Sequence, residues 1–218
     1  MATRKSANSK EHMNKAIKLL ILSDIFVVTG FGLISPILAI FIKENLVGGT
    51  IISAGIASTI FLLTKNIVQL PFSKYVDKYD DRVFWLIVGT FMIACVPFMY
   101  IFAKSIYMLF LAQIIYGFGA ALAYPTWFSV WTSHLDKKHK AFEWSLYSAC
   151  VGIGTAVTAA IGSAISEYIG FVYTFAIVGI MALVGCGILF KLDRDKNVEH
   201  AIQHRRRLII KRHNHYPH

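Results

Sequence analysis

The sequence predicts an all-α integral membrane protein that crosses the bilayer six times. Of its 218 residues, 56% are hydrophobic and only 16% are charged, which is too little charge to cover a soluble domain of this size. Lipid offers no hydrogen-bond partner to exposed backbone, so apolar blocks of about 20 residues must be helices. Six such blocks occur: 19–42, 51–72, 83–102, 106–131, 145–166 and 172–190.

The distribution of Lys and Arg predicts that both termini are cytoplasmic. Nineteen of these residues lie before the first block, between the second and third, between the fourth and fifth, and after the sixth. The other side has only Lys43 and Lys104. Positive charge is enriched on the cytoplasmic side of membrane proteins. The net charge of +10 therefore belongs to that face, next to the lipid of a plasma (inner) membrane, and nothing resembles a nucleic-acid-binding module.

Three regions follow from this layout. Residues 1–16 are polar and predict a disordered cytoplasmic tail, and residues 17–192 form the transmembrane domain. Residues 193–218 form a basic cytoplasmic tail in which apolar residues recur at helical spacing. Two interpretations of this tail stand side by side: an amphipathic helix on the anionic inner leaflet, or a disordered basic segment.

The first block, 19–42, carries Asp24, the one acidic residue well inside a predicted span. A carboxylate in the membrane is expensive, which makes it a candidate functional group. Further along the same block, Pro36 is expected to kink the helix.

The second block, 51–72, runs in the opposite direction and carries Lys65. Asp24 lies six residues past Lys18, about 9 Å deep, and Lys65 lies nine residues before Lys74, about 13 Å deep. Two opposite charges are therefore expected at similar depth.

Two interpretations of this pair are open. The charges face a shared polar interior and bind a transported solute or relay a proton, or they form a structural ion pair while Lys65 extends toward the cytoplasm. Asn66 and Gln69 favour a polar interior, because Lys65 and Gln69 lie one turn apart on one helix face.

A Gly-Phe-Gly sequence followed by a proline occurs in both the first and the fourth block, at 30–32 and 117–119. The two blocks cross the membrane in opposite directions, so the repetition predicts a three-plus-three inverted repeat. The fifth block is rich in small residues, which allow close helix packing. The glycines expected to pack helices are Gly30, Gly32, Gly117, Gly119, Gly154 and Gly162.

Neither a metal site nor an enzyme is expected. Cys95, Cys150 and Cys186 lie inside predicted spans without ligand spacing and are interpreted as packing residues. The chain has no H-E-x-x-H, G-x-S-x-G or P-loop motif. No catalytic residue and no cofactor is therefore predicted.

The loop SKYVDKYDDR, residues 73–82, resembles the signature G-x-x-x-D-R-x-G-R-K/R between helices two and three of major facilitator superfamily transporters. Asp77, Lys78 and Arg82 match this signature. Ser73, Asp80 and Asp81 stand where glycine, glycine and a basic residue are usual.

Three further motifs resemble the same family over roughly residues 17–192. LFLAQIIYGFGAA resembles the helix-four motif, with Gln113 at the position of an arginine implicated in proton transfer in proton-coupled members. GTAVTAAIGS resembles the antiporter motif of helix five, and GFGLISPIL resembles the helix-one motif of the drug/proton antiporter branch. The chain is thus similar to the N-terminal six-helix half of such a transporter.

The resemblance implies a function. Asp77 would pair with a second half and hold one access state, while the first and fourth spans would line a cavity for a small organic solute or drug. A single half has nothing to rock against, so the chain is expected to pair with a second copy or a separate half, or to be a fragment of a longer protein. The alternative is a non-transporting membrane interaction or adaptor protein with a decayed transporter fold.

Overall fold

The computed structural model describes residues 15–79, 81–135 and 139–213, with side chains described as far as Arg194. This part of the chain is helical and contains no strand. The helices are α1 (Lys15–Gly32), α2 (Leu38–Asn45), α3 (Ile51–Lys78), α4 (Arg82–Phe102), α5 (Ile106–His134), α6 (Lys140–Tyr168) and α7 (Phe171–His213). The predicted all-helical class is confirmed.

Five stretches among the described residues are long and apolar enough to cross a membrane: α3, α4, α5, α6 and the Phe171–Arg194 part of α7. The chain is an integral, multi-pass membrane protein. The first predicted span, 19–42, was expected to be a helix kinked at Pro36, and the structure has a full interruption there, since α1 ends at Gly32 and α2 begins at Leu38. Pro36 has no N–H for the helical ladder, and the turn between the two helices is held by shorter bonds such as Ile37 N–H to Ile34 O, 3.0 Å.

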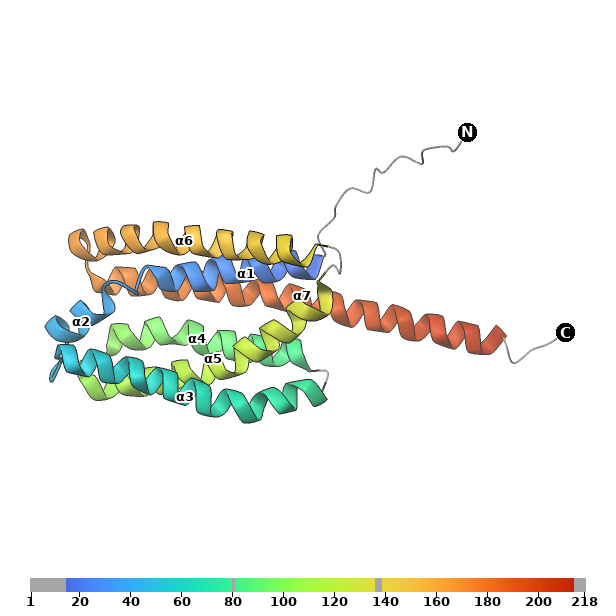
Figure 1. Cartoon of the computed structure of the whole chain (residues 1–218), viewed down its shortest axis with the longest axis horizontal. Helices are drawn as coiled ribbons and strands as arrows, with labels where there is room; N and C mark the ends of the chain where they lie inside the picture. The colour runs from blue at the N-terminus through green and yellow to red at the C-terminus, as the bar shows by residue number, and fades with distance from the viewer. Residues whose placement is uncertain (1–14, 80, 136–138, 214–218) are drawn as a thin grey trace, which may run out of the picture.

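The helices form two groups of three (Figure 1). In one group α3 and α4 both pack on α5, and in the other α6 and α7 both pack on α1. Contacts of α4 with α7 and of α1 with α5 join the groups. The interior contains one apolar cluster near the start of α1 and another near α2.

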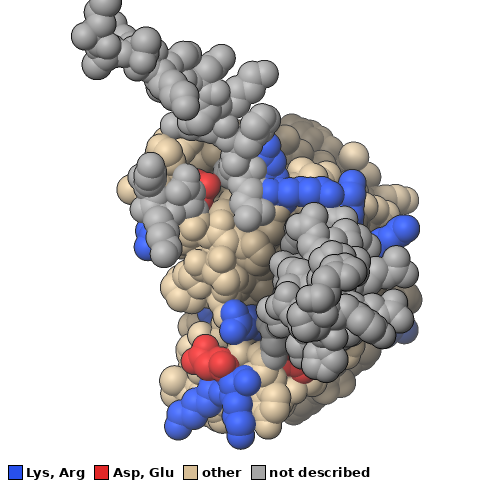
Figure 2. All heavy atoms as spheres, turned by 90° about the vertical axis from the view of Figure 1, so that its right-hand side faces the viewer, with Lys and Arg blue, Asp and Glu red and all other residues tan. Residues whose placement is uncertain are grey.

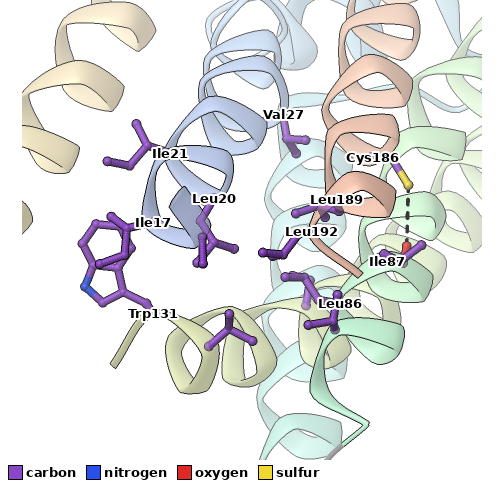
Figure 3. Packing of buried hydrophobic residues seen from close by; sticks show 14 of the residues in the cluster. Ile17, Leu20, Ile21, Val27, Leu86, Ile87, Trp131, Cys186, Leu189 and Leu192 are labelled. Atoms are coloured by element: carbon purple, nitrogen blue, oxygen red, sulfur yellow. Dashed lines mark hydrogen bonds between the residues drawn. The ribbon is translucent and has the colours of Figure 1, made fainter. Parts of the chain in front are cut away.

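The cluster near the start of α1 gathers residues from four helices (Figure 3). Leu20 of α1 lies between Trp131 of α5 and Leu192 of α7, all of them buried. Cys186 belongs to this cluster and its thiol donates to the Ile87 carbonyl at 3.7 Å. The described cysteines are all free thiols within helices.

Glycines of α6 lie where α1 approaches most closely. A Cβ on Gly154 would lie 2.5 Å from Thr29 Cγ2, and a Cβ on Gly162 would lie 2.5 Å from Leu33 Cα. From the other side, a Cβ on Gly32 would overlap the Thr158 hydroxyl. These close approaches let the two helices pack backbone to backbone.

The remaining predicted packing glycines differ in how tightly they are enclosed. A Cβ on Gly117 would lie 2.6 Å from Thr64 of α3, and one on Gly119 would lie 2.9 Å from the Gly89 carbonyl of α4. Gly30 faces Met181 of α7 at an ordinary contact distance of 3.4 Å.

The start of α1 and the far part of α7 lie at the same end of the bundle (Figure 1). Figure 2 views this end, where several Lys and Arg side chains are visible. Beyond Arg194, α7 continues without a break to His213, so most of the predicted basic tail extends the last helix. Residues 1–14 and 214–218 lie outside the described residues.

Candidate functional site

A cavity of about 310 Å³ lies between α1, α4, α5 and α6. Most of its wall is apolar or aromatic, and it contains one carboxylate. The lining residues are Asp24, Val27, Val28, Phe31, Leu86, Thr90, Ile93, Tyr116, Ala123, Tyr124, Trp127, Phe128, Trp144 and Tyr147.

The carboxylate of Asp24 is held by a tyrosine from another helix. Tyr147 of α6 donates its hydroxyl to Asp24 Oδ2 at 2.8 Å. The preceding residue, Ser23, is buried and donates to the Gly185 carbonyl of α7 at 2.9 Å. Successive residues point about 100° apart around a helix, so fixing Ser23 to α7 turns Asp24 toward the cavity. No ion pair joins Asp24 to any cation in the described part of the chain.

Trp127, Trp144 and Tyr147 line the cavity and belong to a cluster of aromatic rings that also includes the buried Trp131. Trp127 stacks on Trp131 with centroids 5.0 Å apart and an angle of 13° between the planes. Tyr147 lies against both rings, at 4.9 and 5.2 Å, and against Trp144 at 5.5 Å. The hydroxyl that binds Asp24 thus belongs to a ring in an aromatic cluster, and the faces of aromatic rings attract cations.

Tyr116 of α5 also lines the cavity. Its ring stacks on Phe31 of α1 at 5.0 Å and on Phe61 of α3 at 4.2 Å. The cavity therefore combines aromatic and apolar side chains with one carboxylate, that of Asp24.

Lys65 lies next to the cavity without lining it. Its ammonium nitrogen is 4.0 Å from the ring centroid of Tyr124, which does line the cavity. The ring of Tyr124 is therefore a contact that Lys65 and the cavity wall share. Asp24 and Lys65 do not form an ion pair, so the structural-pair interpretation does not describe this conformation.

The other polar residues predicted on α3 lie away from the cavity. Asn66 is exposed and donates to the Leu62 carbonyl of its own helix at 2.9 Å. Gln69 is half-buried, and its Oε1 has no hydrogen-bond partner among the described residues.

The predicted loop signature is largely helical, because α3 continues to Lys78 and α4 begins at Arg82. Ser73 donates to the Leu70 carbonyl at 2.9 Å, and Asp77 and Lys78 are exposed. Asp81, at a position that departs from the signature, forms hydrogen bonds on both sides of the turn. Its Oδ2 accepts from Tyr75 Oη and from Trp85 Nε1, both at 2.9 Å. Asp81 thus ties the end of α3 to the start of α4.

A family model described as Major Facilitator Superfamily matches residues 20–214. The chain belongs to this superfamily. Its members are membrane transporters and not enzymes, in agreement with the sequence prediction.

One relative of this major facilitator superfamily chain is "Multidrug resistance protein 1" of Bacillus subtilis (strain 168), 23% identical over 159 residues. The match covers 72% of this chain and 40% of that protein. The chain therefore spans less than half of this relative's length.

The residue at the superfamily's helix-four arginine position, Gln113, lies outside the cavity. It is 3% exposed, and its amide Nε2 donates to the Tyr100 hydroxyl at 3.0 Å inside the apolar cluster near α2. The structure therefore does not bring Gln113 together with Asp24.

Tyr100→Phe is expected to destabilise the protein by about 1–3 kcal/mol, because it leaves the buried Gln113 amide without its partner. The double variant Tyr100→Phe/Gln113→Leu should recover much of this loss, since it removes both polar groups. Thermal unfolding in detergent measures both effects. Equal stability of the single variant and the wild type would contradict this account of the pair.

The aromatic partners of Asp24 and Lys65 were not predicted from the sequence. Tyr147 and Tyr124 lie far from Asp24 and Lys65 in the sequence, and only the packing of α5 and α6 against α1 and α3 brings them together. The sequence held one signal for an aromatic cluster: Trp127, Trp131 and Trp144 all lie near the same end of adjacent predicted spans.

Proposed function

We propose that the chain is one six-span half of a secondary transporter of the major facilitator superfamily, and that its cavity binds a lipophilic organic cation. The single observation that carries this proposal is an Asp24 carboxylate within an otherwise apolar and aromatic wall. The name of the Bacillus subtilis relative supports a drug-like substrate and export.

The chemistry of the cavity favours a cation over a neutral or anionic solute. A carboxylate away from water attracts a positive charge more strongly than a solvated one does. The aromatic faces around it add cation–π attraction and bury the apolar body of the ligand. A proton and an organic cation can each neutralise the same carboxylate, and competition between them would couple transport to a proton gradient.

The proposed topology counts α1, the turn at 33–37 and α2 as one crossing. Together with the five other stretches this gives six spans, with both termini in the cytoplasm and the basic end of Figure 2 facing inward. Lys43 and Lys104 then lie at the outer end, and the membrane is the plasma (inner) membrane.

Alternating access requires a second half, and α3 and α6 are the surfaces that we propose it covers. Only 11% of the apolar window of α3 and 6% of that of α6 are buried, against 44–50% for α4, α5 and α7. A second copy or a separate six-span half seated there would close the cavity and would give the loop residues Asp77, Lys78 and Arg82 a partner surface.

Cysteine crosslinking tests self-pairing. In a variant whose three native cysteines are replaced by alanine, Ile67→Cys on α3 and Ile153→Cys on α6 should each yield crosslinked dimers in membranes. Both positions are 67% exposed. Ile180→Cys on α7, which is 58% exposed, is the matched control and should stay monomeric. Monomers at all three positions would argue against a homodimer and in favour of a separate half.

Tryptophan fluorescence tests the binding step directly, because Trp127 and Trp144 line the cavity. Tetraphenylphosphonium should quench the fluorescence of the purified chain saturably, and uncharged triphenylmethane should not compete with it. Uptake of the same cation into proteoliposomes under a pH gradient then tests transport. Absence of saturable quenching would favour the alternative, an adaptor that uses the helical extension of α7 beyond Arg194 to contact a partner.

A further inference from the structure

Two opposite charges flank the cavity, and each is held by a neutral group. The Asp24 carboxylate accepts a hydrogen bond from Tyr147, and the Lys65 ammonium lies over the ring of Tyr124. Within the described residues, Asp24 has no cationic partner and Lys65 has no anionic one. Charges in a low-dielectric setting are costly to leave without an opposite charge.

We propose that the cavity is built for a dipolar amphiphile: a zwitterion whose cationic group pairs with Asp24 and whose acidic group pairs with Lys65. This inference rests on the proposed function and specifies its substrate class. The apolar part of such a molecule lies against the aromatic and apolar lining, and its two charges compensate the two charges of the protein.

The geometry around Tyr124 makes Lys65 available to a ligand. The Lys65 nitrogen is 4.0 Å from the Tyr124 ring centroid, and the same ring lines the cavity. A lysine has a flexible four-carbon stem and three donors, so its ammonium can exchange the ring face for a carboxylate at the edge of the cavity. Lys65 is half-buried, so solvent screens such a pair less than it screens one on an open surface.

The space is compatible with one small ligand. A volume of about 310 Å³ is at the lower end of the range for small-molecule pockets. Two other roles for Lys65 make different predictions. If Lys65 pairs with Asp24 in another conformation, or extends to the aqueous end of the bundle, an acidic group on the ligand brings no advantage.

Rhodamine B and its ethyl ester separate these possibilities, because the zwitterion and the cation share one chromophore. Their affinities for the full chain in non-ionic detergent can be measured by fluorescence anisotropy. The wild type should bind rhodamine B about fivefold more tightly than the ester, the preference expected for one partly screened charge pair. Lys65→Met should remove this preference while ester binding persists, which also shows that the cavity is intact. Lys65→Arg should retain the preference.

Lys74→Met is the matched control, because it removes the same charge from an exposed position of the same helix. It should leave the preference for rhodamine B unchanged. Equal affinities of the two dyes for the wild type, or a preference that survives in Lys65→Met, would overturn the inference and leave the cation site standing. If neither dye binds the wild type, the proposed function fails and this inference fails with it.

Discussion

Asp24→Asn is expected to weaken binding of tetraphenylphosphonium by at least about 30-fold, because it removes the one charge that compensates the cation in an apolar cavity. Asparagine keeps the size of the side chain, and its carbonyl oxygen can still accept the Tyr147 hydroxyl. The loss of affinity would therefore come from the missing charge and not from a change in the shape of the site. Titration of tryptophan fluorescence measures it, and uptake into proteoliposomes under a pH gradient should fall in parallel.

Glu167→Gln provides the control for Asp24→Asn. It also removes one negative charge, from an exposed position near the end of α6 and away from the cavity. It should bind the cation like the wild type. An Asp24→Asn variant that folds, binds and transports normally would remove the carboxylate from any role in recognition or coupling.

Gly162→Ala is expected to lower the apparent melting temperature by about 5 °C. The new Cβ would lie 2.5 Å from Leu33 Cα, and this backbone cannot move aside as a side chain can. Overpacking of this kind costs about 1–3 kcal/mol. The substitution pushes α6 away from the turn that follows α1, so it should also weaken cation binding by displacing Tyr147. Thermal unfolding in detergent measures the first effect and fluorescence titration the second.

Gly152→Ala is the comparison within the same helix. A Cβ there meets no atom within 4 Å, so the variant should melt at the wild-type temperature or slightly above it, since alanine favours helix. If both alanines lowered the melting temperature equally, the effect would come from the substitution itself and not from the α1–α6 contact.

The helices were predictable because the membrane imposes a length and a composition on every crossing. The break in the first of them was partly visible, since Pro36 pointed to a kink. The extent of the break was not predictable, because Pro36 alone suggested a bend and the chain instead forms a turn and a separate short helix, α2. Leu33 in that turn packs closely against Gly162 of α6, a contact between residues far apart in the sequence that no local pattern encodes.

The sequence predicted individual residues of the candidate site but not which residues contact one another. Asp24 and Lys65 stood out because charge is rare in apolar blocks. Their partners did not, because the hydrogen bond from Tyr147 joins residues 123 positions apart. Gln113 was predicted to be a site residue because of its place in a motif. The structure instead pairs it with the buried Tyr100 in the cluster near α2.

The hydrogen bond of Ser23 to α7 also constrains how the carboxylate can travel. Asp24 is the next residue, so α1 cannot swivel to carry it elsewhere without giving up that bond to Gly185. Any conformational change that keeps this bond must therefore move Asp24 together with the part of α7 around Gly185.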